Sequence, residues 1–324
     1  MEENTEQRVD LTLFSEKIQE LKDRIACVIV GQEQTVDLVL TAILANGHVL
    51  IEGVPGVAKT LLARLTARLI DADFSRVQFT PDLMPSDVLG TTVFNMKTNG
   101  FDFHQGPIFA DIVLVDEINR APAKTQAALF EVMEERQISI DGTTHRMGDL
   151  YTILATQNPV EQEGTYKLPE AQLDRFLMKI TMDYPSLEEE VNILERHRTN
   201  AALVKLDDIT PAITKEEVLS LRAFMNQVFV DRTLLQYIAL IVQQTRTSKA
   251  VYLGASPRAS VAMLQSSKAY ALLQGRDFVT PEDIKFVAPY VLQHRLILTA
   301  EAEMEGYSPV KVTQRLIDKV EVPK

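Results

Sequence analysis

Apolar residues recur at helical spacing at the start of the chain. Leu11, Phe14, Ile18, Leu21 and Ile25 lie three or four positions apart, which places them on one face of a helix. A second amphipathic stretch covers residues 32–45. We therefore expect the chain to open with helices.

A different pattern follows, in which short apolar runs alternate with longer amphipathic ones. Residues 48–52 are mostly apolar and lead at once into Gly53 and Pro55, and then into the apolar-rich residues 59–69. This order predicts a strand, a glycine-rich loop and a helix. The alternation continues with a helix at 124–135 and with strands near 77–79, 112–115, 152–155 and 177–181. It predicts an α/β fold with a parallel sheet flanked by helices.

Two segments interrupt this alternation and have the pattern of β-hairpins. In the first, residues 92–94 and 101–103 flank a turn that ends in Asn99-Gly100. In the second, residues 138–140 precede Asp141-Gly142 and a return through residues 144–146. Both are predicted to be insertions into the core fold.

After Tyr184-Pro185 the strand signals fade and helix starts replace them. Thr214 and Thr280 each precede an acidic residue by three positions, which is the capping-box pattern, and Ser256-Pro257 places proline at a first helical position. A domain boundary is expected near Ser186, between a larger α/β domain (1–186) and a small all-α domain (187–324). The tail after Met304 is weakly periodic and is expected to be mobile.

Composition limits the partners and the cellular location that we expect for this chain. The chain has 324 residues with a formal net charge of −12, which disfavours nucleic acid as a partner. No apolar run approaches the roughly 18 residues that cross a bilayer, and residues 1–10 are acidic and polar, so membrane insertion is not expected and a cytoplasmic location is. Cys27 is the only cysteine; it can form no internal disulfide and is expected to be a small core residue.

The glycine-rich loop carries the first candidate chemistry. At a strand-to-helix junction, backbone N–H groups and the helix N-terminus can surround phosphates. Lys59 would contact the β and γ phosphates of a nucleotide, and Thr60 a magnesium ion. Alanine stands where the usual pattern has glycine before the lysine, and the alternative is an ordinary glycine turn that caps a helix. The candidate nucleotide-binding residues of this loop are Gly53, Val54, Pro55, Gly56, Val57, Ala58, Lys59, Thr60 and Leu61.

Two acids end the buried strand at 112–115. Asp116 can hold magnesium, directly or through water, and Glu117 can orient and deprotonate the water that attacks the γ phosphate. The alternative is a pair of solvated acids at the start of a turn. The occurrence of both acids together with the glycine loop favours catalysis.

Three further residues are candidates for the same chemistry. Asn158 follows the strand at 152–155 and is a suitable neutral hydrogen-bonding group to position a water near the γ phosphate. Arg175 and Arg258 are candidates for stabilising charge during phosphoryl transfer, although most arginines are surface or ion-pair residues.

In this order the motifs resemble those of AAA+ ATPases, and specifically the MoxR family, over about residues 31–298. Gly31 and Gln32 resemble the segment near the adenine, and residues 79–87 and 106–109 flank the insert that the family carries in its second helix. Asp116 and Glu117 resemble Walker B, Asn158 sensor 1, Arg175 the arginine finger and Arg258 sensor 2.

The resemblance implies a P-loop AAA+ core with β-hairpin inserts, followed by a helical lid, that binds ATP or ADP with Mg²⁺. It implies a ring, usually a hexamer, in which Arg175 reaches the neighbour's γ phosphate, while Arg258 acts on its own nucleotide or across the interface. It also implies a chaperone-like role on client proteins, often ones with von Willebrand factor A domains. The two hairpins are candidates for client contact or, equally, for contact between subunits.

Two other functions share these motifs. A nucleic-acid motor is one, because helicase and chelatase relatives have the same insert, but the acidic composition and the lack of interleaved aromatic and basic residues argue against it. A nucleotide-gated scaffold with little hydrolysis is the other, and Ala58 is its only support. The five histidines are scattered and suggest neither a metal site nor a nucleophilic hydrolase.

Overall fold

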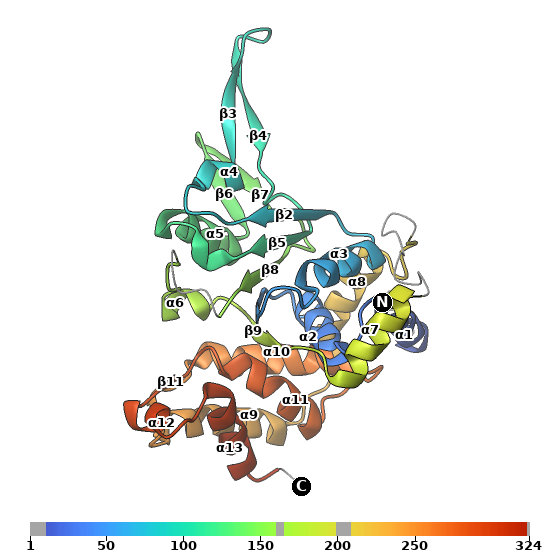
Figure 1. Ribbon diagram of the computed structural model, residues 1–324, viewed down its shortest axis with the longest axis vertical. Helices are drawn as coiled ribbons and strands as arrows, with labels where there is room; N and C mark the ends of the chain where they lie inside the picture. Colours follow the sequence, from blue (N-terminus) through green and yellow to red (C-terminus); the bar gives the residue numbers. More distant parts are fainter. Residues whose placement is uncertain (1–10, 160–164, 199–208, 323–324) are drawn as a thin grey trace, which may run out of the picture.

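The computed structural model describes residues 11–159, 165–198 and 209–322. Its centre is a sheet of five strands in the order β2-β5-β8-β1-β9 (Figure 1). All neighbouring pairs are parallel, as the alternation of strands and helices predicts. The strands are β1 (Val49–Gly53), β2 (Phe74–Gln78), β5 (Ile112–Asp116), β8 (Thr152–Gln157) and β9 (Met178–Met182).

The central strands are apolar on both faces because both faces are covered. In β5, Ile112 and Leu114 belong to a core shared with α2 (Glu33–Leu44) and α3 (Lys59–Leu69). The alternate residues Val113 and Val115 belong to a second core, shared with α5 (Ala123–Glu135). Successive side chains of a strand point to opposite faces, so a strand between two helical layers is apolar throughout.

The first helix, α1 (Leu11–Val28), packs against α2, and α7 (Leu187–Arg198) is attached to the end of α1. Arg196 of α7 donates hydrogen bonds to the carbonyls of Ala26 and Cys27, at 3.0 and 2.8 Å. The expectation that Cys27 is a core residue is wrong, because its side chain is exposed. Ile25 and Ile29 are buried, and Cys27 lies midway between them, so it faces the opposite side of the helix.

Both predicted hairpins are present. The first pairs β3 (Gly90–Asn95) with β4 (Gly100–Gln105) after the short α4 (Pro85–Leu89), and it projects far from the body (Figure 1). The second pairs β6 (Gln137–Ile140) with β7 (Thr143–Arg146). The hydroxyl of Thr92 donates to the Asp141 carboxylate at 2.5 Å, which ties the two hairpins together.

The C-terminal part is helical, as predicted. Thr214 and Thr280 cap their helices with the expected capping boxes, and Pro257 is the first residue of its helix. This part also contains a short antiparallel pair of strands that the all-α prediction did not include, β10 (Val251–Leu253) and β11 (Ile297–Leu298). The helices are α8 (Lys215–Phe224), α9 (Arg232–Thr247), α10 (Pro257–Leu273), α11 (Pro281–Leu292), α12 (Ala300–Met304) and α13 (Pro309–Lys319). The domain boundary near Ser186 stays a prediction.

The tail after Met304 is more ordered than its sequence pattern suggests. Ser308 caps α13, and Val312, Leu316 and Ile317 are buried as this helix packs against α9 and α11. The expectation of a mobile tail is therefore wrong for residues 309–319. Burial of one face of a short helix against two others supplies order that the helix would lack alone.

Candidate functional site

The carboxyl ends of three neighbouring strands and the loop after β1 enclose a cavity of about 380 Å³. Parallel strands bring their carboxyl ends to one edge of the sheet, which is where α/β proteins bind their ligands. The cavity is lined by Pro55, Gly56, Ala58, Lys59, Thr60, Leu61, Arg76, Gln78, Asp116, Glu117, Thr156 and Asn158. We call it the phosphate cavity, and nine of these twelve residues are among the predicted site residues.

The backbone of the glycine loop limits which residues can occupy it. A Cβ on Gly53 would lie 2.8 Å from the carbonyl oxygen of Met182, and Gly56 has φ of +91°. Ala58 also has positive φ, +62°, a left-handed conformation that costs a residue with a side chain roughly 1–2 kcal/mol. The Nζ atom of Lys59 returns across the loop to donate to the Gly53 carbonyl at 2.5 Å. The loop is thus closed on itself, with its lysine beside the helix start.

Asp116 is a buried carboxylate with specific partners. Arg76 Nε lies 2.6 Å from its Oδ2 atom, and the Thr156 hydroxyl donates to its Oδ1 atom at 3.0 Å. The same hydroxyl accepts the backbone N–H of Glu117, also at 3.0 Å. Thr156 therefore connects β8 to both acids. Sequence reasoning missed Arg76, which belongs to no local motif, and Thr156, which lies in the 155–159 segment that resembles sensor 1 but was given no role of its own.

Glu117 turns its carboxylate toward the cavity from a left-handed backbone, with φ of +57°. Gln78 donates to its Oε2 atom at 2.7 Å, and Arg120 Nε lies 3.2 Å from the same atom. Gln78 was also missed. It is opposite Asp116 in the β2–β5 register, and Arg76 lies two residues before it, on the same face of the strand. This alternation of polar residues was the available signal.

A second cavity, of about 270 Å³, adjoins the first. Gly56, Ala58 and Leu61 line both. Its remaining wall comes from the end of α1, the following turn, Val57 of the glycine loop, Pro185 and α7, and it is apolar except for three side chains. The residues of that wall are Val28, Ile29, Val30, Gln32, Val57, Pro185, Ile193, Arg196 and His197. An apolar slot with a few polar groups suits a flat heterocyclic base.

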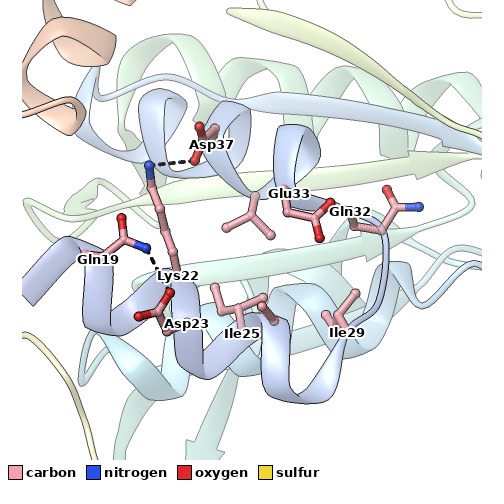
Figure 2. Close-up of a pocket in the computed structure, with 10 residues that line it drawn as sticks. Gln19, Lys22, Asp23, Ile25, Ile29, Gln32, Glu33 and Asp37 are labelled. Carbon is pink, nitrogen blue, oxygen red and sulfur yellow. Dashed lines mark hydrogen bonds and ion pairs between the residues drawn. The ribbon is translucent and has the colours of Figure 1, made fainter. Parts of the chain in front are cut away.

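Of the two residues predicted to lie near the adenine base, only one lines the second cavity. Gln32 lines the second cavity, but Gly31 does not. The φ of Gly31 is +72°, a conformation that favours glycine, and a Cβ there would displace the flexible carboxylate end of Glu189. Gly53 and Val54 likewise lie outside both cavities. Figure 2 shows a further groove of about 230 Å³ between α1 and α2, which shares Ile29 and Gln32 with the second cavity.

Arg175 and Arg258 lie elsewhere, and neither lines the phosphate cavity. Both contact Glu134 of α5: Arg175 Nε at 3.4 Å and Arg258 Nη2 at 2.8 Å. The Arg175 guanidinium also lies 5.9 Å from the centre of the Phe130 ring. We call Arg175, Arg258 and Glu134 the arginine cluster. The structure brings the two predicted arginines together, but apart from the residues that line the phosphate cavity.

Two buried histidines hydrogen-bond to the backbone of neighbouring elements. His48 precedes β1; its Nδ1 atom accepts the N–H of Ile153 at 3.0 Å, so its Nε2–H faces the Met133 carbonyl at 3.1 Å. Burial lowers the pKa of His48 to about 3. His294 Nε2 lies 3.0 Å from the Phe176 carbonyl, next to Arg175, and burial lowers the pKa of His294 well below its usual value.

The donor atoms of the phosphate cavity fit magnesium better than a softer metal. Among the residues that the structure describes, no group of three or more His, Cys, Asp or Glu side chains could hold a metal ion. The cavity instead offers the Asp116 carboxylate and the Thr60 hydroxyl, which are hard oxygen ligands. Magnesium is commonly held by one or two such groups together with phosphates and water.

Comparison with known proteins agrees with this geometry. Residues 48–178 match the model of the ATPase family associated with various cellular activities (AAA), and residues 243–318 match the AAA lid domain. The fold and the site thus define an AAA-type ATPase with a nucleotide-binding core and a lid.

Similar full-length proteins identify the family. The chain is 48% identical to the uncharacterized protein YeaC of Bacillus subtilis over 91% of this chain and 92% of that one. It is 44% identical to the chaperone MoxR1 of Mycobacterium tuberculosis over 92% and 80% of the two chains. A crystal structure of a candidate ATPase from Cytophaga hutchinsonii superposes with a TM-score of 0.88 at 41% identity, covering 97% of each chain. The chain belongs to the MoxR family of AAA+ ATPases.

The family confirms the predicted class, and with it nucleotide binding. Over the described part of the chain, no helix has both the length and the apolar character needed to cross a membrane.

Proposed function

We propose that this protein is a magnesium-dependent ATPase that works as a ring, with each site completed by a neighbouring subunit, and that it uses hydrolysis to remodel client proteins. One observation carries the proposal. The phosphate cavity gathers Lys59, Thr60, Asp116, Glu117 and Asn158 within one chain, whereas the arginine cluster lies outside it.

In this proposal the two adjoining cavities hold one nucleotide. The base enters the apolar cavity beside Gln32, and the phosphates follow the glycine loop, where backbone N–H groups and the start of α3 favour negative charge. Lys59 leaves the Gly53 carbonyl and contacts the β and γ phosphates. The exchange of a neutral partner for an anionic one favours that movement.

Asp116 and Thr60 would hold the magnesium ion, which neutralises charge on the phosphates when bound. Glu117 accepts the proton of the attacking water, and Asn158 orients the water or the γ phosphate. Gln78 and Arg120 hold the Glu117 carboxylate, at 2.7 and 3.2 Å. A carboxylate whose position is fixed by protein groups needs little reorganisation during reaction, and pre-organised charge of this kind lowers a barrier most effectively.

Arg175 is proposed to reach the γ phosphate of the neighbouring subunit. Its absence from the lining of its own phosphate cavity supports action across an interface, and Arg258 shares its carboxylate partner, Glu134. We propose the same direction of action for Arg258. A hexamer is the ring size that the family resemblance implies.

The proposed client surface is the tip of the β3–β4 hairpin. Phe94, Met96 and Phe101 are exposed there, on an element that projects from the body (Figure 1). Exposed apolar groups on a projecting hairpin suit transient contact with another protein. The kind of client, one with a von Willebrand factor A domain, and the cytoplasmic location remain expectations from the family and the composition.

The first test is the ATPase rate per subunit, measured against protein concentration with magnesium present. The wild-type rate should rise with concentration as rings form. Arg175→Ala should lower it by 10² or more while ATP still binds, because an arginine finger contributes about 10³ to 10⁵ in rate where it is established. Arg232→Ala, at an exposed position of α9, is the matched control and should behave as wild type.

Glu117→Gln separates hydrolysis from binding in the same assay. It should keep ATP affinity and lose turnover by about 10² to 10⁴, the usual contribution of a general base. A rate that is independent of concentration and unaffected by Arg175→Ala would contradict the ring proposal. A Glu117→Gln variant with the wild-type rate would contradict the assignment of the base.

A further inference from the structure

The segment that carries Arg175 is held by a buried arginine from the lid. Arg295 follows α11, and only 4% of its side chain is exposed. Its Nε atom donates to the Asp174 carboxylate at 2.6 Å. Its terminal nitrogens donate to the carbonyls of Asp174 at 3.2 Å, Phe176 at 2.7 Å and Leu177 at 3.1 Å, and also to the Val291 carbonyl. Arg295 therefore binds the residues on both sides of Arg175.

The geometry fits a positioning task better than a packing task. A buried guanidinium must be compensated by hydrogen bonds and opposite charge, and here nearly all of that compensation comes from one segment, residues 174–177. The planar fork of arginine can span a carboxylate and several carbonyls at once, whereas the single ammonium of lysine cannot.

Other lid residues also hydrogen-bond to the segment around Arg175. His294 faces the Phe176 carbonyl at 3.0 Å, and Gln293 donates to the Lys179 carbonyl. Ser256, which precedes the helix of Arg258, has its hydroxyl 3.4 Å from the other Asp174 oxygen. Asp174 thus lies between the lid segments of Arg295 and Arg258, directly before Arg175.

We infer that Arg295 is a positioning residue for catalysis in the neighbouring subunit: it fixes the backbone from which Arg175 projects, through Asp174 and the carbonyls on either side. The inference rests on the proposed action of Arg175 across a ring interface. If Arg295 has this role, the orientation of the lid in one subunit affects the rate of hydrolysis of the nucleotide bound to the next subunit.

The test uses Arg295→Lys and Asp174→Asn in the full chain, with Arg276→Lys as the matched control. Arg276 is also a partly buried lid arginine, 2.6 Å from the Asp283 carboxylate, but it lies away from Arg175 in sequence and contacts. Both test variants should lose about tenfold or more in kcat with the ATP dissociation constant unchanged, since a displacement of about 1 Å can cost 10²-fold. Arg276→Lys should keep the wild-type kcat.

Mixing subunits separates positioning from damage to the fold. Arg295→Lys subunits have an intact phosphate cavity, and Glu117→Gln subunits have an intact Arg175. Mixed rings should therefore recover activity, with a rate per Arg295→Lys subunit that rises as Glu117→Gln is added. A mixture of Arg295→Lys with Arg175→Ala should not recover.

The outcomes distinguish this inference from the function on which it rests. If Arg175→Ala keeps the wild-type rate, the proposed ring mechanism fails. If Arg175→Ala is inactive but Arg295→Lys matches Arg276→Lys, or its loss is not restored by Glu117→Gln subunits, the inference about Arg295 fails alone.

Discussion

The phosphate cavity and the arginine cluster differ in how their charged groups are partnered. In the cavity each charged group already has a partner placed by neighbouring strands: Asp116 has Arg76 and Thr156, and Glu117 has Gln78. In the cluster, two arginines share one carboxylate, Glu134, and neither arginine lines the phosphate cavity. In the ring that we propose, binding belongs to the subunit and catalysis is shared between subunits.

The largest expected effect separates the two regions by what they bind. Lys59→Ala should weaken ATP binding by about 100-fold or more, because a lysine directed at phosphates makes a charge-assisted contact worth about 1.5–3 kcal/mol or more in a partly buried site. Arg175→Ala should leave binding to the isolated subunit unchanged. Fluorescent-nucleotide titration at a protein concentration below assembly measures both. Equal losses in the two variants would contradict the division between binding and catalysis.

The second prediction concerns how firmly the cavity is pre-organised. Gln78→Ala should lower kcat about tenfold without changing ATP affinity, because Glu117 would lose its 2.7 Å hydrogen bond and keep only Arg120. Gln105→Ala, at an exposed position of β4, is the control. A faster rate in Gln78→Ala would mean that Gln78 restrains Glu117 rather than orienting it.

The third prediction concerns the two buried histidines, His48 and His294. The pKa of His48 is lowered to about 3 and that of His294 well below its usual value, so the unfolded chain binds more protons than the folded one below about pH 6.5. Their neutral forms stabilise the fold fully above pH 6.5, and that contribution is lost as pH falls. Each should cost roughly 1.4 kcal/mol per pH unit.

Urea unfolding between pH 7.5 and 5 measures this slope. His48→Asn should halve the part of the slope that the two histidines cause, although it also lowers stability at neutral pH. An unchanged slope in that variant would contradict the burial-based shift of His48.

The smallest expected effect concerns Ala58. Its φ of +62° costs roughly 1–2 kcal/mol that glycine avoids, and part of this gain is offset by the greater freedom of glycine in the unfolded chain. Ala58→Gly should therefore stabilise the nucleotide-free protein by about 0.5 kcal/mol. Ala127→Gly, at an exposed helical position of α5, should instead cost about 1 kcal/mol. Equal destabilisation by both would contradict strain at Ala58.

These two regions also differ in how well they can be predicted from sequence. The glycine loop and the acids after β5 are local patterns, because a strand, a tight turn and a helix start are encoded by adjacent residues. Gln78 and Arg76 act through a neighbouring strand, and their pairing depends on register, which no local pattern states. The attachment of Arg295 to Asp174 joins residues 121 positions apart, and is visible only in the folded chain.

The errors have physical causes of the same kind. Cys27 was expected in the core from its residue type, but the phase of α1 places it outward. The tail after Met304 was interpreted as weakly periodic, yet Ser308-Pro309 is a helix start, and Val312, Leu316 and Ile317 recur at helical spacing and pack α13 against α9 and α11. In both cases the spacing of apolar residues along the helix, rather than residue type alone, decides which side chains are buried.

The outward position of Cys27 has a practical consequence. It is the only thiol in the chain, it is exposed, and its carbonyl accepts a hydrogen bond from Arg196 of α7, which also lines the second cavity. One maleimide dye would therefore label each subunit at a single known position, on the residue before Val28, which lines the proposed base site. Its emission would report occupancy of that site, and energy transfer between two such dyes would report how subunits are arranged.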